Sequence, residues 1–247
     1  MKGDIALITG AGRRQGIGAA ICRSLAREGN HVWFTCLPEV EEDEAGRLAE
    51  ELHSFGVQAR FSPINLADAQ APRQLLEKVE AEWDLPRILV NNAAHSERDL
   101  TFETLDADGL DAHYAVNLRA SLLLSVQFAR RCPSGSDGRI ISMTSGQSLG
   151  AMPGELAYVA TKGGIEAFTR TLAAEVAPKG ITVNAVNPGP TDTGWITEEI
   201  RRELLPRFPL GRIGLPEDAA RLVAFLARKE AGWITGQVIH SEGGFYR

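Results

Sequence analysis

Short apolar runs alternate with longer amphipathic stretches along the chain. The apolar runs predict strands at Ile5–Thr9, Val32–Cys36, Val57–Phe61, Ile88–Asn91, Arg139–Met143, Thr182–Val186 and Gln237–His240. Between them apolar residues recur at helical spacing, as at Ile17, Ile21 and Leu25. Such alternation requires parallel strands joined by right-handed crossovers, and apolar strands indicate helices on both sheet faces. The pattern predicts an α/β fold in which residues 1–247 form one doubly wound domain around a mainly parallel seven-stranded sheet.

The composition is that of an ordinary globular protein and excludes several functional classes. Hydrophobic residues make up 44% of the 247 residues, charged residues make up 23%, and the formal net charge is -6. A mildly acidic chain with scattered Lys and Arg binds nucleic acid poorly, so no nucleic-acid partner is expected. Because no apolar segment is long enough for a membrane span or a signal peptide, we expect no membrane partner.

The three cysteines, Cys22, Cys36 and Cys132, are widely separated and odd in number. That arrangement predicts neither a disulfide framework nor a zinc site, and no Cys/His/Asp grouping has metal-ligand spacing, so no metal is predicted. Such cysteines usually behave as small buried hydrophobic residues. We expect a reducing, intracellular location, most simply the cytoplasm.

A glycine-rich loop lies between the first predicted strand and the first predicted helix. It runs from Thr9 to Gly18 and includes Gly10, Gly12 and Gly16. Glycines let a backbone turn tightly and approach a pyrophosphate closely. The following helix N-terminus offers unpaired N–H groups and the positive end of the helix dipole. In this strand–turn–helix position, the loop predicts a Rossmann-type dinucleotide-binding fold.

The residues after the second predicted strand bear on which dinucleotide binds. An NAD site commonly has an Asp or Glu at that strand's end, which accepts a hydrogen bond from the ribose 2′-hydroxyl. Here no acid stands at the tip, and we interpret the acidic run Glu39–Glu44 as a solvated helix start. Arg13 and Arg14 could instead bind a 2′-phosphate, with solvated arginines as the alternative. The sequence therefore favours NADP(H) over NAD(H).

Tyr158 and Lys162 are four residues apart in a predicted helix and should share one face of it. The reference pKa of tyrosine is about 10, and a neighbouring lysine cation should lower it. Such a phenol could pass a proton to a carbonyl that accepts a hydride. Ser145, after the fifth predicted strand, could hold the substrate oxygen. A surface Tyr–Lys pair is the usual alternative, but the glycine loop and Ser145 favour catalysis.

Together these motifs resemble the short-chain dehydrogenase/reductase family over essentially the whole chain, and most closely its 3-oxoacyl-carrier-protein-reductase-like members. The resemblance implies catalytic roles for Asn117, Ser145, Tyr158 and Lys162, with Asn117 ordering a water for proton relay. It also implies a nicotinamide-binding segment at Asn187–Thr193 and a homotetramer. The predicted cofactor residues are Gly10, Gly12, Arg13, Arg14, Gly16, Ile17, Asn65, Leu66, Asn91, Ala93, Tyr158, Lys162, Pro188, Gly189, Thr191 and Thr193.

The chain departs from the family pattern at several positions. Five residues, Ala11–Gln15, separate Gly10 from Gly16 where the family usually has three, so the loop must bulge. Asn65 stands where the family often has Asp, Ala94 where it usually has Gly, and Glu242 where it often has Asp. These differences bear on the cofactor side of the site and leave the catalytic motif intact.

We expect an NAD(P)(H)-dependent oxidoreductase that transfers a hydride between nicotinamide and a small-molecule carbonyl or secondary alcohol, with 3-oxoacyl thioesters or similar ketones as substrates. An NAD-dependent alcohol or sugar dehydrogenase and a non-catalytic dinucleotide-binding regulator are the alternatives. The substrate should lie beyond the strand ends, under a mobile lid formed by Gly194–Phe208. Candidate lining residues are His95, Ser96, Gln147, Ser148, Met152, Pro190 and Trp195.

Overall fold

The computed structural model describes residues 3–246, so residues 1, 2 and 247 of the predicted domain lie outside the described part. Its centre is a seven-stranded sheet of order β3-β2-β1-β4-β5-β6-β7, in which every strand pairing is parallel. The strands are β1 (Ile5–Ile8), β2 (His31–Cys36), β3 (Ala59–Pro63), β4 (Ile88–Asn91), β5 (Arg139–Met143), β6 (Thr182–Asn187) and β7 (Val238–His240). The strand order reverses between β1 and β4, which is where doubly wound sheets form their ligand crevice.

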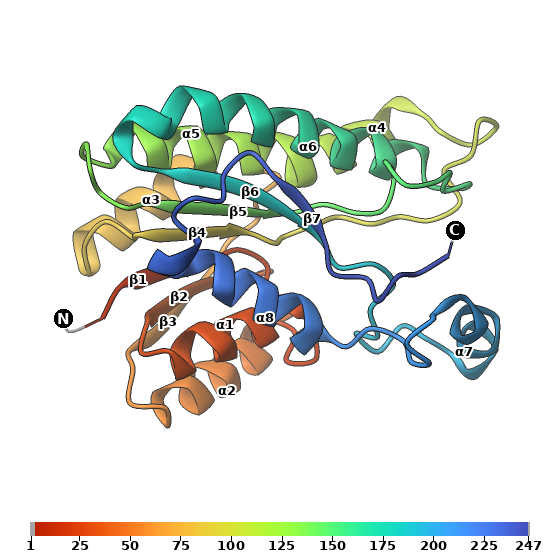
Figure 1. Cartoon of the computed structure of the whole chain (residues 1–247), viewed down its shortest axis with the longest axis horizontal. Coiled ribbons are helices and arrows are strands. Elements are labelled where there is room, and N and C mark those ends of the chain that lie inside the picture. The colour runs from red at the N-terminus through yellow and green to blue at the C-terminus, as the bar shows by residue number, and fades with distance from the viewer. Residues whose placement is uncertain (1–2, 247) are drawn as a thin grey trace.

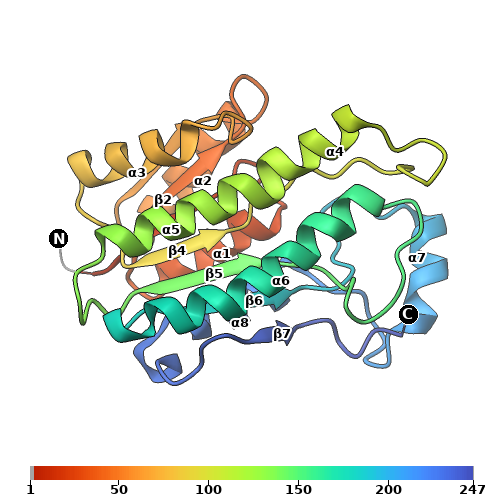
Figure 2. The ribbon, with the colours of Figure 1, turned by 90° about the horizontal axis from the view of Figure 1, so that it is seen from above.

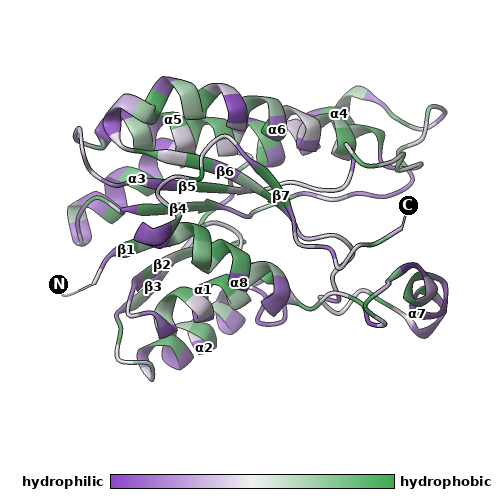
Figure 3. Cartoon of the chain, in the orientation of Figure 1, coloured by the Kyte–Doolittle hydropathy of each residue, from purple (hydrophilic) through white to green (hydrophobic). Residues whose placement is uncertain are grey.

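Helices cover both faces of this sheet, and Figures 1 and 2 show the three resulting layers. One face packs against α1 (Ile17–Arg27), α2 (Glu42–His53) and α8 (Pro216–Ala227), and the other against α3 (Ala71–Glu82), α5 (Ser121–Arg131) and α6 (Leu156–Val176). Each face has its own apolar core, and Figure 3 shows mainly apolar strands between helices with alternating apolar and polar bands. The predicted doubly wound α/β fold is confirmed.

The helix predicted around Leu118 is longer and less regular than its periodicity indicated. It runs through α4 (Ala107–His113), a π-helical segment (Tyr114–Ala120) and α5 without a break. A π-helix carries extra backbone per turn and often occurs at functional sites. Apolar spacing could not reveal this widening, because the residues on either side keep an ordinary helical repeat.

Two shorter features lie at the carboxyl edge of the sheet. After β6 the chain forms α7 (Glu198–Leu204) and a short 3-10 turn, Leu205–Arg207, which Figure 1 shows standing apart from the main layers. Because parallel strands all point the same way, the loops that follow β1, β4, β5 and β6 meet at this edge. The predicted cofactor and catalytic motifs lie on these loops or on the helices that begin there.

Candidate active site

The glycine loop after β1 is shaped by close backbone contacts. Gly10 has a φ of +68°, and a Cβ added to it would come within 2.6 Å of Ala93 Cα. Its N–H donates to Thr35 Oγ1 at 2.9 Å, and its carbonyl accepts from Asn92 Nδ2 at 2.8 Å. Helix α1 begins behind Gly16 with no side-chain cap. The loop therefore presents uncapped helix N–H groups, which suits a pyrophosphate.

A cleft of about 540 Å³ opens beside this loop. Its predicted cofactor residues are Gly10, Arg13, Gly16, Ile17, Asn65, Leu66, Ala93, Tyr158, Lys162, Pro188 and Thr193. Gly12, Arg14, Asn91, Gly189 and Thr191 are absent from that lining. Loops from both halves of the sheet thus meet around one space that fits a dinucleotide in size and in backbone chemistry.

Two of these residues have local structural partners. The Asn91 amide donates to Ser125 Oγ at 2.9 Å and to Ser142 Oγ at 3.2 Å, so it ties β4 to α5 and β5 inside the protein. Asn65 lies in the cleft, but its Oδ1 accepts from the Ala67 N–H at 2.9 Å. Asn91 therefore supports the sheet, whereas Asn65 presents its amide NH₂ more readily than its oxygen.

An acidic residue occupies the tip of β2, in contrast to the sequence-based prediction. The Glu41 carboxylate folds back to accept the Leu37 N–H at 3.0 Å, and Glu41 lines the cleft with Cys36 and Leu37. A Cβ added to Gly12 would lie 2.4 Å from Glu41 Oε2. Glu41 thus stands between the glycine loop and β2, where an NAD site commonly has its acid.

The two arginines predicted to bind a 2′-phosphate both face carboxylates. Arg14 forms an ion pair of 3.0 Å with Glu51, and its backbone N–H donates to Glu44 Oε2 at 2.9 Å. Arg13 lies 3.8 Å from Glu41 Oε1 and has a largely exposed side chain. Arg14 is thus held away from the cleft by carboxylates, whereas Arg13 lines the cleft beside Glu41.

Tyr158, Lys162 and Ser145 come together at the other end of the cleft. Tyr158 lies near the start of α6, and Lys162, one turn later, has its Nζ 5.5 Å from the Tyr158 ring centroid. The Lys162 ammonium donates to the Met143 carbonyl at 2.9 Å. Ser145, two residues further along the chain, hydrogen-bonds the Tyr158 hydroxyl. Tyr158 and Lys162 line the cleft, and the Ser145 hydroxyl lies beside Tyr158.

The electrostatics of this group differ from the sequence-based expectation. Burial and, to a smaller extent, the Glu155 carboxylate raise the pKa of Tyr158 to about 12, against the opposing effect of Ser145. Burial also lowers the pKa of Lys162 to about 8. The prediction that Lys162 depresses the phenol pKa is therefore wrong for this structure. Desolvation of the phenol is the largest effect on its pKa, so Tyr158 is a protonated acid near neutral pH.

The lowered pKa of Lys162 predicts a pH dependence of stability. Between about 8 and its ordinary value of 10.5, the unfolded chain keeps this proton and the folded chain releases it. The free energy of unfolding of the wild type, relative to Lys162→Met, should therefore rise with pH across that window, by on the order of 2 kcal/mol. Urea unfolding of both cofactor-free proteins at several pH values checks this. Lys229→Met, an exposed change, should leave the slope unaltered, and a flat difference for Lys162→Met would contradict the prediction.

Asn117 lies in the π-helical segment and is buried. Its Oδ1 accepts the His95 N–H at 2.7 Å, and its Nδ2 donates to the His95 carbonyl at 2.9 Å and to Thr161 Oγ1 at 3.2 Å. The Asn117 side chain thus links the loop after β4 to α6, the helix that carries Tyr158 and Lys162. A relay water at Asn117 would have to use its backbone rather than its amide.

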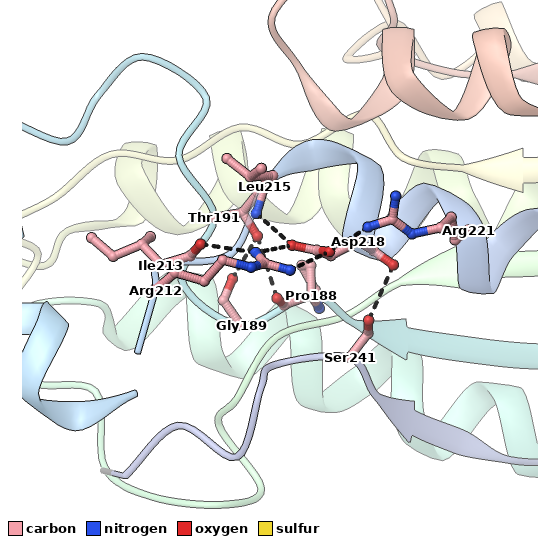
Figure 4. Close-up of polar contacts among 9 residues, drawn as sticks. All are labelled: Pro188, Gly189, Thr191, Arg212, Ile213, Leu215, Asp218, Arg221 and Ser241. Atoms are coloured by element: carbon pink, nitrogen blue, oxygen red, sulfur yellow. Dashed lines mark hydrogen bonds and ion pairs between the residues drawn. The ribbon is translucent and has the colours of Figure 1, made fainter. Parts of the chain in front are cut away.

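The segment after β6 is braced by a polar network, shown in Figure 4. Asp218, near the start of α8, receives both guanidinium ends of Arg212 at 2.6 and 2.8 Å and an Arg221 bond at 2.6 Å. The Arg212 hydrogen bond holds the pKa of Asp218 well below its usual range. Through the adjoining Gly214 carbonyl, which accepts the Asp192 N–H at 2.8 Å, this network supports the predicted nicotinamide-binding segment.

Of the candidate substrate residues, Trp195 contacts the segment after β6 and the loop after β4, whereas Gln147 and Ser148 contact Glu166. Trp195 donates to the Thr191 carbonyl at 2.8 Å, and the Arg98 guanidinium stacks 4.5 Å above its ring. Gln147 and Ser148 direct their donors to the buried Glu166 instead of outward. Trp195 therefore links the segment predicted as a lid to the loop after β4. The sequence analysis did not identify Arg98, Glu41 or Glu166 as site residues.

The fold, the glycine loop and the Ser–Tyr–Lys group define a class, the nicotinamide-dependent oxidoreductases of Rossmann type. The family model described as Enoyl-(Acyl carrier protein) reductase matches residues 10–246. The chain belongs to the short-chain dehydrogenase/reductase family.

Individual relatives agree over the full length. The uncharacterized oxidoreductase YjdA of Bacillus subtilis is 56% identical over 247 residues, covering 98% of this chain and 97% of that protein. The 3-oxoacyl-(acyl-carrier-protein) reductase FabG of Escherichia coli is 37% identical over 250 residues, covering 99% and 98%.

Solved structures show the same likeness. A short-chain dehydrogenase/reductase from Serratia marcescens has a TM-score of 0.90 at 34% identity, covering 98% of each chain. A blue fluorescent protein from a metagenomic library, in complex with NADPH, has a TM-score of 0.92 at 32% identity, covering 99% of this chain and 98% of that one.

Residues 3–246 also bear on membrane and metal binding. Within that range no helix combines the length and apolar character needed to cross a membrane. The same residues hold no group of three or more His, Cys, Asp or Glu side chains that could bind a metal ion.

Proposed function

We propose that this protein reduces a ketone to a secondary alcohol with a reduced nicotinamide dinucleotide, with 3-oxoacyl thioesters or similar ketones as substrates. The observation that carries the proposal is the position of Tyr158 beside the buried Lys162 in the cleft that the glycine loop borders, with Ser145 near enough to Tyr158 to lower its pKa. FabG, named as a 3-oxoacyl-(acyl-carrier-protein) reductase, supports the substrate class through its 37% identity.

Different parts of the cleft would bind different parts of the cofactor. The loop Gly10–Ile17 would hold the pyrophosphate, Asn65, Leu66 and Ala93 would flank the adenosine, and Pro188–Thr193 would hold the nicotinamide amide. The bound cofactor supplies the hydride. The uncapped N-terminus of α1 and the glycine at position 10 support this fit. Any side chain at Gly10 would clash with Ala93 on the cleft wall.

The protein's own groups handle the oxygen and the proton. Ser145 and Tyr158 donate hydrogen bonds to the substrate oxygen and hold its carbon toward the cleft. As negative charge develops on that oxygen, Tyr158 gives it the phenolic proton. The Lys162 ammonium, 5.5 Å from the ring centroid, then stabilises the phenolate. A Tyr158 pKa of about 12 keeps the phenol protonated near neutral pH, so it can give its proton to the substrate oxygen.

We further propose that NAD(H) is the preferred cofactor, in place of the NADP(H) that the sequence favoured. Glu41, at the β2 tip, can accept a hydrogen bond from a ribose 2′-hydroxyl. The same carboxylate would repel a 2′-phosphate, and the acidic first turn of α2, Glu42 to Glu44, adds to that repulsion. Arg13 is the one predicted phosphate ligand in the cleft lining, and its partner is Glu41.

Glu41 also keeps a second candidate open, an NAD-dependent alcohol or sugar dehydrogenase. The absence of an acid at the β2 tip was the argument against it, and Glu41 removes that argument. A non-catalytic dinucleotide sensor has less support, because a sensor needs no hydroxyl pair beside a buried lysine.

A substrate screen separates these functions. The purified chain is given NADH or NADPH with a panel of 3-oxoacyl thioesters, simple ketones and aldehydes, and in reverse NAD⁺ or NADP⁺ with alcohols and sugars. Loss of reduced-nicotinamide absorbance with 3-oxoacyl thioesters is the expected result. Turnover only of alcohols or sugars would favour the dehydrogenase, and cofactor binding without any turnover would favour the sensor.

We also propose that the chain works as one domain in a homotetramer, in the cytoplasm. The buried free cysteines Cys22, Cys36 and Cys132 support a reducing compartment. Exposed apolar side chains such as Phe102, at 87%, and Trp233, at 98%, support further association. Light scattering should give four times the mass of the 26.7 kDa chain, and a monomeric mass would refute the assembly.

A further inference from the structure

Glu166 is a buried carboxylate that the mechanism above does not use. It lies one turn after Lys162 on α6, with only 5% of the residue exposed. Its Oε1 accepts from Gln147 Nε2 at 2.6 Å, from Ser148 Oγ at 3.1 Å and from Thr144 Oγ1 at 3.5 Å. A buried carboxylate is costly unless donors compensate its lost hydration. Here those donors all come from the loop after β5, on both sides of Ser145 in the sequence.

The same helix also holds the chain on the other side of Ser145. The Lys162 ammonium donates to the Met143 carbonyl at 2.9 Å, and the Thr144 hydroxyl donates to the Lys162 carbonyl at 3.1 Å. Two successive turns of α6 therefore bind the residues before Ser145 and the residues after it. Ser145 therefore lies between two segments of the chain that α6 holds in place.

We propose that Glu166 is a positioning residue that sets where the Ser145 hydroxyl lies relative to the Tyr158 phenol. Tyr158, Lys162 and Glu166 follow one another at four-residue spacing and so lie along one face of α6. Tyr158 is placed by the helix directly, and Ser145 is placed by the same helix through Glu166. The inference rests on the proposed function, because it requires both hydroxyls to meet one substrate oxygen.

The contact pattern offers a conservative variant. All three hydrogen bonds end on Oε1, whereas Oε2 has only the exposed Arg170 guanidinium at 3.9 Å. In Glu166→Gln the amide oxygen can replace Oε1, so the loop should keep its attachments. Glu166→Leu removes every acceptor at similar side-chain size. Glu175→Leu, on an exposed position of the same helix, is the matched control.

Steady-state kinetics on an active ketone test the proposal. Glu166→Leu should lower kcat about tenfold to a hundredfold, since a small misplacement of a reacting group has effects of this size. Its affinity for reduced cofactor, measured by nicotinamide fluorescence, should be unchanged, because Glu166 lies outside the cleft lining. Glu166→Gln and Glu175→Leu should stay within about threefold of wild type.

A double-mutant cycle with Ser145→Ala separates positioning from a general structural role. If Glu166 acts through Ser145, Glu166→Leu should cause little further loss in the Ser145→Ala background. Three results would each overturn the proposal. They are an equal loss of kcat from Glu166→Leu in both backgrounds, a wild-type kcat for Glu166→Leu, and a Glu166→Gln variant as impaired as Glu166→Leu. If Glu166→Leu does not fold, Gln147→Leu breaks the 2.6 Å bond from the loop side and takes its place in the same cycle.

These outcomes are distinct from failure of the proposed function. Wild-type turnover with an unimpaired Glu166→Leu variant refutes only the role of Glu166. A wild type that turns over no carbonyl in the screen refutes the proposed function, and the positioning role with it.

Discussion

Tyr158→Phe should lower ketone reduction by about a thousandfold or more while leaving cofactor affinity within about twofold of wild type. The variant removes the phenol that serves as the proton donor in the proposed mechanism, and general-acid catalysis contributes roughly 10²–10⁴-fold. The ring itself stays, so the packing of the cleft wall should persist. Stopped-flow absorbance gives the turnover, and fluorescence titration with NADH gives the affinity.

Tyr114→Phe is the matched control, because Tyr114 is half exposed and does not line the cleft. It should retain wild-type rates. A Tyr158→Phe variant with a similarly high rate would remove Tyr158 as the acid. A Tyr158→Phe variant that loses NADH binding as well would instead give the phenol a role in holding the cofactor.

Glu41→Ser should shift the ratio of NADH to NADPH affinity by about a hundredfold toward NADPH. Loss of a charge-assisted hydrogen bond should weaken NADH binding about tenfold. Loss of the repelling carboxylate also frees Arg13, now 3.8 Å from Glu41, to meet a 2′-phosphate. Dissociation constants for both reduced cofactors, measured by fluorescence without substrate, give the result directly.

Asp43→Ser removes the same charge from the first turn of α2 at an exposed position, and it should change the ratio much less. A wild type that binds NADPH more tightly than NADH would contradict the assignment of Glu41. Equal effects of the two substitutions would assign the preference to net charge near α2 instead of to Glu41.

The sequence predicted the five inner strands of the sheet well because they are buried on both faces. Continuous apolar runs identified all seven strands, and the fourth and fifth matched residue for residue. The third strand was placed too early, at Val57 instead of Ala59, because Val57 is buried although it precedes the ladder. Apolar periodicity reports burial, and burial extends beyond hydrogen-bonded pairing.

The motifs also placed the site on the correct loops, but they could not predict contacts that depend on backbone turns. Glu41 reaches the β2 tip because the chain reverses around Glu39, which has a φ of +61°, and brings its carboxylate back to the Leu37 N–H. Spacing alone made Glu41 part of a solvated helix start. The role of Glu166 likewise depends on the path of the loop after β5, which no periodicity describes.

The error over the Tyr158 pKa has a different origin. Sequence reasoning included the Lys162 charge one turn away, but not the burial of the phenol or the Glu155 carboxylate beside it. Both omitted effects raise the pKa, and burial is the larger. A sequence motif identifies the charged neighbours that affect the pKa of a group. The effect of burial on that pKa can be judged only from the three-dimensional structure.

Isotope tracing tests the central claim most directly. The wild type and Tyr158→Phe are each incubated for the same time with a reactive ketone and reduced cofactor that carries deuterium at both C4 positions of nicotinamide, and the amount of labelled alcohol formed is measured by mass spectrometry. We predict deuterium on the carbinol carbon with the wild type and almost none with Tyr158→Phe. Unlabelled alcohol from the wild type, or equal labelling by both proteins, would contradict hydride transfer assisted by Tyr158.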